Sequence, residues 1–236
     1  MKKTLIASSI ALLAVYATSA SASSGVYVSG EVGTSIINVK DKSITDTYTY
    51  QGDSDVTTLN FKNKNKSVFG GGVAVGYDFY DQYQVPVRME FAAKFRGDAS
   101  DANSSQTFGD DSYSLKLKNK VRMDTYMVNG YYDFHNSSDF TPYLTAGIGL
   151  SHLKSNITEE DGDGISADAN KFAWGVGAGV KYAITSNISI DASYRYVDGG
   201  KVTGSRTETA GNASDTISTS TKASSNDLML GVSYKF

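Results

Sequence analysis

Apolar and polar residues alternate with a period of two along eight stretches of the chain. In PVRMEFAAKFR (86–96), for example, Met89, Phe91 and Phe95 are separated by charged or small residues. A period of two predicts a β-strand with two unlike faces. The other seven stretches are VYVSGEVGTSI (26–36), VFGGGVAVGYDFY (68–80), YMVNGYYDF (126–134), PYLTAGIGLSH (142–152), FAWGVGAGVKYAI (172–184), ISIDASYRY (188–196) and DLMLGVSYKF (227–236). The apolar phase reverses in VRMDT (121–125), before the fourth strand, which indicates either a β-bulge or emergence of the strand from a membrane.

The connections between these stretches alternate between short and long. The short ones are DQYQ, HNSSD and TSN, and the long polar ones cover roughly 40–66, 97–118, 154–170 and 200–225. The long segments therefore gather at one end of the sheet, and the tight turns and both termini gather at the other. Strands of about 10 residues, an even strand number and this rhythm predict an all-β, eight-stranded antiparallel transmembrane barrel with long extracellular loops and short periplasmic turns.

The polar face distinguishes this barrel from a soluble β-sandwich. It is rich in glycine and in charges of both signs, which could pair inside a narrow lumen, because eight strands enclose only enough space for side chains. The apolar face carries aromatic residues toward the strand ends, as lipid-interface girdles do. The charges expected to form a lumen network are those of Glu31, Asp78, Arg88, Glu90, Lys94, Arg96, Asp133, Lys181, Asp191, Arg195 and Asp227.

The first 22 residues predict a secretory signal peptide, followed by a single barrel domain over 23–236. Lys2 and Lys3 precede a short apolar run, and Ala20-Ser21-Ala22 forms a small-x-small cleavage site. Removing the two lysines takes the formal net charge from −3 to −5, so nucleic acid is not an expected partner. No stretch after the signal approaches 18 consecutive apolar residues, which excludes helical spans. The mean hydropathy of −0.29 is that of a soluble chain because it averages two unlike strand faces.

The candidate chemistry is sparse. The chain has no cysteine and two histidines. The glycine runs at 70–76 and 175–179 are not followed by a helix pattern, so they fail as phosphate loops. His135 lies in a turn, His152 has Ser151 on the opposite strand face, and the carboxylates of 159–164 lack the spacing of a calcium loop. We therefore predict no enzyme activity, no cofactor and no metal site.

Two basic runs are the candidate binding residues. Their cations recur with a period of two, which sets them on one side of an extended segment at a spacing suited to the sulfates or phosphates of a polyanion. Both runs lie where a long loop descends into a strand. The residues are Lys62, Lys64 and Lys66 in the first run and Lys116, Lys118, Lys120 and Arg122 in the second. The alternative is that these cations contact lipopolysaccharide phosphates or remain solvated.

Four segments carry a family resemblance: GGGVAVGYDFYDQYQVPVRMEFAAKFRG, LKNKVRMDTYMVNGYYDFHNSSDFTPYLTAGIGLSHLK, FAWGVGAGVKYAITSNISIDASYRYVDGG and DLMLGVSYKF. They resemble the Tia/Hek heat-resistant agglutinins, enterobacterial outer-membrane adhesins related to opacity-protein and OmpX-like barrels. The long loops do not match. The resemblance implies agglutination, adherence to epithelial cells and a sulfated proteoglycan as the receptor class. Tyr234 and Phe236 also resemble the C-terminal signal that the barrel-assembly machinery reads.

We therefore predict a Gram-negative outer-membrane adhesin, a virulence factor that binds the host-cell surface through its exposed loops. The expected partners are membrane lipid and lipopolysaccharide, host glycans or proteoglycans, the assembly machinery and a second copy of the chain. One alternative is a structural barrel that contacts lipopolysaccharide or serum factors without a host receptor. A lesser alternative is a lipid-modifying enzyme.

Overall fold

The computed structural model describes residues 25–60, 63–108, 113–159 and 164–236, and it gives the side-chain positions of most of them. The predicted signal peptide and Lys62 lie outside these ranges. The elements are β1 (Val26–Tyr50), β2 (Asp53–Asn60), β3 (Lys64–Asp78), α2 (Tyr80–Tyr83), β4 (Val87–Arg96), β5 (Ala99–Phe108), β6 (Tyr113–Asp133), β7 (Phe140–Glu159), β8 (Gly164–Ala183), β9 (Ile188–Ala210) and β10 (Ala213–Lys235). No helix in the described ranges is long and apolar enough to cross a membrane.

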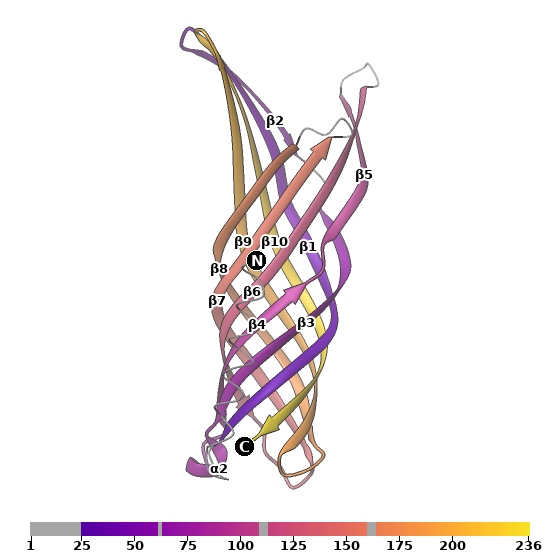
Figure 1. The fold of residues 1–236 in the computed structure, drawn as a ribbon, viewed down its shortest axis with the longest axis vertical. Coiled ribbons are helices and arrows are strands. Elements are labelled where there is room, and N and C mark those ends of the chain that lie inside the picture. The colour runs from indigo at the N-terminus through magenta and orange to yellow at the C-terminus, as the bar shows by residue number, and fades with distance from the viewer. Residues whose placement is uncertain (1–24, 61–62, 109–112, 160–163) are drawn as a thin grey trace.

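Eight of these strands close into an antiparallel ring, which confirms the predicted fold class. The order around the ring is β1-β3-β4-β6-β7-β8-β9-β10, and β10 pairs with β1 to close it. The two remaining strands, β2 and β5, pair with β1 and β6 outside the ring (Figure 1). At the lower end the Phe236 N–H donates to the carbonyl oxygen of Val26 at 3.0 Å, so the two described chain ends meet there.

The outer face of the ring carries a continuous apolar belt. In β4, Phe91 and Phe95 are exposed, whereas Arg88, Lys94 and Arg96 are buried on the other face. Cross-strand pairing aligns the belt in rows, for example Val128–Ile148–Trp174 and, nearer the mouth, Tyr126–Leu150–Phe172. Exposed apolar rows on every strand of the ring are what a lipid-facing wall requires.

The interior of the barrel has two layers. Near the mouth it is an apolar core that includes Ile37, Val39, Met123, Leu153 and Val197. Below that core the inward positions carry most of the charged residues of the interior, together with the buried tyrosines Tyr27, Tyr131 and Tyr143. The reversed phase of VRMDT follows from this arrangement: β6 pairs with β7 without a register shift, so Met123 faces inward like Asp133. The strand leaves the lipid there, and no bulge is involved.

Much of the sequence predicted as long loops is instead β-strand. We call residues 43–60 and 202–220 the tower, a four-stranded sheet in the order β2-β1-β10-β9 that extends beyond the barrel mouth (Figure 1). Two-residue turns join its strands, with Gln51 and Gly52 at φ of 50° and 96° and Gly211 at 61°. Above its base, where Val202 and Thr219 are buried, the tower is partly or fully exposed on both faces. Its threonines and serines therefore show no apolar alternation that could predict strands.

Two irregularities bend the strands at the base of the tower. The β1–β10 register shifts between Lys40 and Ser43, where Asp41 has a φ of 50°. The β9–β10 register shifts between Lys222 and Ser224, opposite Gly200, which has a φ of 82°. A glycine with positive φ at an extra residue is the usual form of a bulge that sharpens strand twist.

Candidate functional site

The upper part of the interior charge network is built around one buried ion pair. Arg96 donates from Nε and Nη2 to the two carboxylate oxygens of Asp227, at 3.1 Å and 2.6 Å. Arg96 also donates from Nη1 to the Met123 carbonyl at 3.1 Å. Lys94 lies beside them, with its Nζ 2.8 Å from Glu31 and 3.5 Å from Asp227. The arrangement satisfies most of the polar groups that it withdraws from water.

The lower part of the network joins charged groups through tyrosines. Arg88 forms a bidentate pair with Asp133 at 2.6 Å and 2.9 Å, and its guanidinium lies 4.4 Å from the centre of the Tyr131 ring. Glu90 accepts hydrogen bonds from Tyr27 at 3.1 Å and Tyr131 at 2.8 Å. The charged members of this network were predicted from the sequence, but Tyr27 and Tyr131 were not. Both lie in phase with the inward face, yet tyrosine occurs on both faces of the wall, so residue type alone does not mark them as network members.

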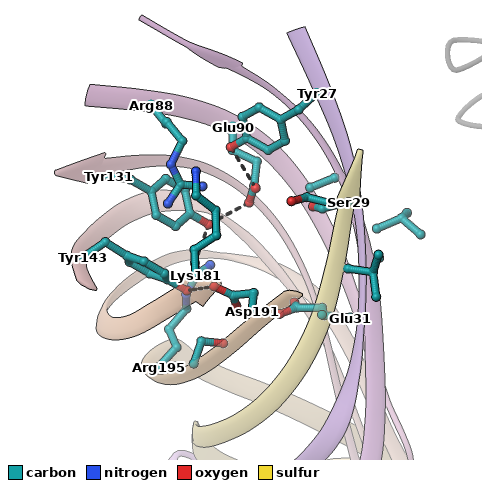
Figure 2. A pocket seen from close by; sticks show the side chains of 17 residues that line it. Tyr27, Ser29, Glu31, Arg88, Glu90, Tyr131, Tyr143, Lys181, Asp191 and Arg195 are labelled. Carbon is teal, nitrogen blue, oxygen red and sulfur yellow. Dashed lines mark hydrogen bonds between the residues drawn. The ribbon is translucent and has the colours of Figure 1, made fainter. Parts of the chain in front are cut away.

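Four further inward side chains, those of Arg195, Tyr143, Asp191 and Lys181, line a small cavity in this region. Arg195 donates to the Tyr131 hydroxyl at 2.8 Å, and Tyr143 donates to Asp191 at 2.7 Å. Figure 2 shows these side chains and Lys181 converging from different strands. The cavity has a volume of about 50 Å³, enough for a few water molecules. At the lower end, the Lys235 Nζ lies 3.6 Å from Asp78 and 2.6 Å from Asp81.

The geometry offers no nucleophile–base pair at the histidine singled out from the sequence. Ser151 lies inside the wall and donates its hydroxyl proton to the Gly199 carbonyl. His152 lies on the outer face, with Nδ1 2.9 Å from the Asn170 side-chain oxygen. Within the described ranges no group of three or more acidic or histidine side chains could hold a metal ion. Most of the acidic segment 159–164 lies outside those ranges.

The two basic runs lie on opposite faces of the barrel wall. Lys64 and Lys66 of β3 pair with Val39 and Ile37, which face inward. The two lysines are therefore on the inner side of the wall, and both are exposed because they lie at the mouth. Arg122 is in phase with Tyr126 and therefore lies on the outer face.

The second run is also partly neutralised by carboxylates. The Lys120 Nζ is 2.8 Å from Asp98, and Arg122 Nε is 3.1 Å from Asp124. The side chains of Lys116 and Lys118 lie outside the described residues. Because of this arrangement, the described cations do not form one continuous basic surface.

The assembly-signal residues lie at the closing seam. Tyr234 is exposed on the outer face of β10, and its ring lies 5.1 Å from that of Phe236. Their recognition by the assembly machinery remains a prediction.

Comparison with known proteins places the chain among membrane barrels. The sequence model of the outer membrane protein β-barrel domain matches residues 5–236. The chain belongs to this family. It is 49% identical over 236 residues to the outer membrane protein PagN of Salmonella typhimurium, with 96% of each chain covered. It is 25% identical over 158 residues to a putative adhesin of Rickettsia conorii, covering 63% of this chain and 61% of that one.

Solved structures give the same fold. A major outer membrane protein of Thermus thermophilus superposes with a TM-score of 0.53 at 14% identity, covering 84% of this chain and 100% of that one. The predicted outer-membrane location of this family member is therefore confirmed. The Tia/Hek subgroup is not among the families found, and membership of it remains a prediction.

Proposed function

We propose that this outer-membrane barrel is an adhesin that contacts the host-cell surface through its extracellular end, which consists of the tower and the barrel mouth at its foot. The observation that supports it most is the tower itself, a sheet held out from the mouth with Tyr48 and Tyr50 about half exposed. Exposed tyrosines are common in binding surfaces. The relative named as a putative adhesin supports the same assignment. Many copies on one cell would add weak contacts into avidity.

The receptor class that we propose is a sulfated glycan, bound low on the mouth rather than at the tip. One row across the tower reads Asp55–Tyr48–Asp215–Glu208, and Asp46 lies in the next row. These carboxylates would repel a polyanion. The exposed cations Lys64 and Lys66 lie at the foot of the tower, where sulfates could be held.

The test is adherence of a non-adherent bacterial host that displays the protein to cultured epithelial cells, with and without soluble heparin. We expect adherence that heparin removes and that Lys64→Gln/Lys66→Gln reduces severalfold. Arg206→Gln is the matched control, since Arg206 is an exposed tower cation paired with Glu208 at 2.5 Å. Adherence that resists heparin would redirect the search to Tyr48 and Tyr50. Surface display without any adherence would contradict the adhesin.

The second candidate is a structural barrel without a host receptor. The pairing of Lys120 with Asp98 and of Arg122 with Asp124 favours it, because paired cations offer less to a soluble polyanion. In that case Lys64→Gln/Lys66→Gln would change outer-membrane permeability to a hydrophobic dye and leave adherence unchanged.

A further inference from the structure

Two rows of polar side chains follow the apolar belt on the outer face of β6, β7 and β8. The strands run without register shifts here, so cross-strand pairing fixes the rows. The last apolar row is Tyr126–Leu150–Phe172. The next two toward the mouth are Asp124–His152–Asn170 and Arg122–Lys154–Asp168. Lys154 and His152 lie near Arg122 only because of this register, so no sequence motif predicts the grouping.

The Arg122–Lys154–Asp168 row lies at the height of the headgroup region of the membrane. Arg122 is four residues beyond Tyr126, which is about 13 Å along a strand and roughly 10 Å along the normal at the usual barrel tilt. The polar region of a bilayer leaflet is about 5–8 Å deep. Long cationic side chains can lean toward it from just above, so both cations reach the level of lipid phosphates.

Arg122 and Lys154 are directly opposite each other on neighbouring strands. Like charges at that position repel, and an anion between them would relieve the repulsion. Arg122 contacts Asp124 through Nε alone, at 3.1 Å, and no contact within the described ranges uses its two terminal amino groups. Lys154 Nζ contacts Asp168 at 2.9 Å, and its ammonium has three donors.

The neighbouring carboxylates do not cancel this site. Asp124 is largely buried against the wall. It also accepts a hydrogen bond from the backbone N–H of Arg96, the last residue of β4, at 3.1 Å. Asp168 is shared between Lys154 and His152, whose Nε2 lies 3.4 Å away. Asp98 contacts Lys120 one row farther out.

We infer that Arg122 and Lys154 form a binding site for the phosphorylated headgroup of an outer-leaflet glycolipid, with its acyl chains on the belt below. The exposed side chains of Ile148, Leu150, Phe172 and Trp174 supply an apolar seat directly beneath the two cations. The shared requirement is a phosphate ester joined to long acyl chains, which a soluble sulfated glycan lacks. The site thus assigns Arg122 to the membrane rather than to a host polyanion, and it is independent of the proposed adhesin function.

Trp174 provides the measurement, since it is the chain's single tryptophan and lies in the seat. The full-length folded protein in phosphate-free maltoside micelles is titrated with diphosphoryl lipid A, with dephosphorylated lipid A and with inorganic phosphate alone, following Trp174 fluorescence. We expect the diphosphoryl form to bind more tightly than the dephosphorylated form. Arg122→Gln/Lys154→Gln should weaken that preference by about 5-fold per cation.

Two controls keep the experiment decisive. Arg206→Gln removes a paired cation far from the belt and should leave the preference intact. The gel mobility of unheated samples shows that each variant is folded. Equal binding of the two lipid forms by the native protein, or an unchanged preference in the double variant, would overturn the site. Competition by inorganic phosphate alone at equal concentration would assign it to free phosphate instead of lipid.

Discussion

At the scale of single residues, the Arg96–Asp227 pair is the most demanding contact of the barrel. Both side chains are fully buried, and they join β4 to β10, which are 131 residues apart in sequence. Withdrawing two charges from water costs several kcal/mol each, and the bidentate geometry offsets that cost only while both partners remain. The pair therefore stabilises the fold only when both side chains are present.

The first prediction concerns this pair. Asp227→Ala should lower the free energy of unfolding by about 3–5 kcal/mol, because it leaves the Arg96 guanidinium buried without a counter-ion. Arg96→Met/Asp227→Leu should recover most of the loss, since Lys94 keeps Glu31 at 2.8 Å. Urea titration followed by the gel mobility of unheated samples measures both. A single variant as stable as the native barrel would contradict the buried-charge argument.

The second prediction uses two glycines of β1. A Cβ at Gly33 would clash with the Leu228 carbonyl oxygen and approach Met229 Cα to 2.9 Å, whereas a Cβ at Gly30 would meet only the Gly72 carbonyl, at 3.9 Å. Gly33→Ala should destabilise the barrel by about 1–3 kcal/mol, as overpacking does. Gly30→Ala is the matched control and should be nearly neutral. The urea midpoint of each variant decides the comparison.

At the scale of elements, the tower contains a like-charge contact. Asp46 and Asp215 are diagonal neighbours on the adjacent strands β1 and β10, and the Asp46 carboxylate raises the pKa of Asp215 above its usual range. Glu208 is directly opposite Asp215, which adds to the repulsion. The tower should therefore be the least stable part of the sheet at neutral pH.

The third prediction is a pH dependence of the tower alone. A carboxyl whose pKa is raised by folding binds its proton more tightly in the folded state, so the tower should gain stability as the pH falls through that pKa. Asp215→Asn should slow hydrogen exchange in peptides of 213–220 at pH 7 and flatten its pH dependence, after correction for intrinsic rates. Asp53→Asn removes one charge without touching the pair and should change neither. An identical profile for both variants would contradict the pairing.

Strands could be predicted from the sequence where their two faces meet different surroundings, lipid on one side and the lumen on the other. Phe91 and Arg88 alternate because one faces lipid and the other the lumen, so the belt strands were predictable. Thr45, Thr47 and Thr49 alternate with Asp46 and Tyr48 in a strand that water surrounds, and such a pattern resembles a loop. Register explains the missed grouping of Arg122 with Lys154, because cross-strand neighbours are set by pairing and not by spacing along the chain.

At the scale of the whole molecule, the two interior layers close the lumen. Ile37, Met123 and Leu153 fill the upper level, and the network around Arg88 and Tyr131 fills the lower one. The fourth prediction is that the purified barrel in planar bilayers gives no large, stable conductance steps, because the cavity left within the lower layer is as small as about 50 Å³. A larger porin is the positive control. Reproducible open levels of uniform size would show that the layers separate.

The ring closes where β1 meets β10 from Tyr27–Lys235 to Tyr50–Ala213. The first strand therefore waits for the last one to be synthesised and exported, and the loop between them spans most of the chain. Contacts of such sequence separation form slowly. Until β10 arrives, the edge of β1 stays open to other extended chains, which makes the time spent in the periplasm a hazard in itself. A barrel of this topology thus depends on a holding partner during transit as much as on the contacts of its finished wall.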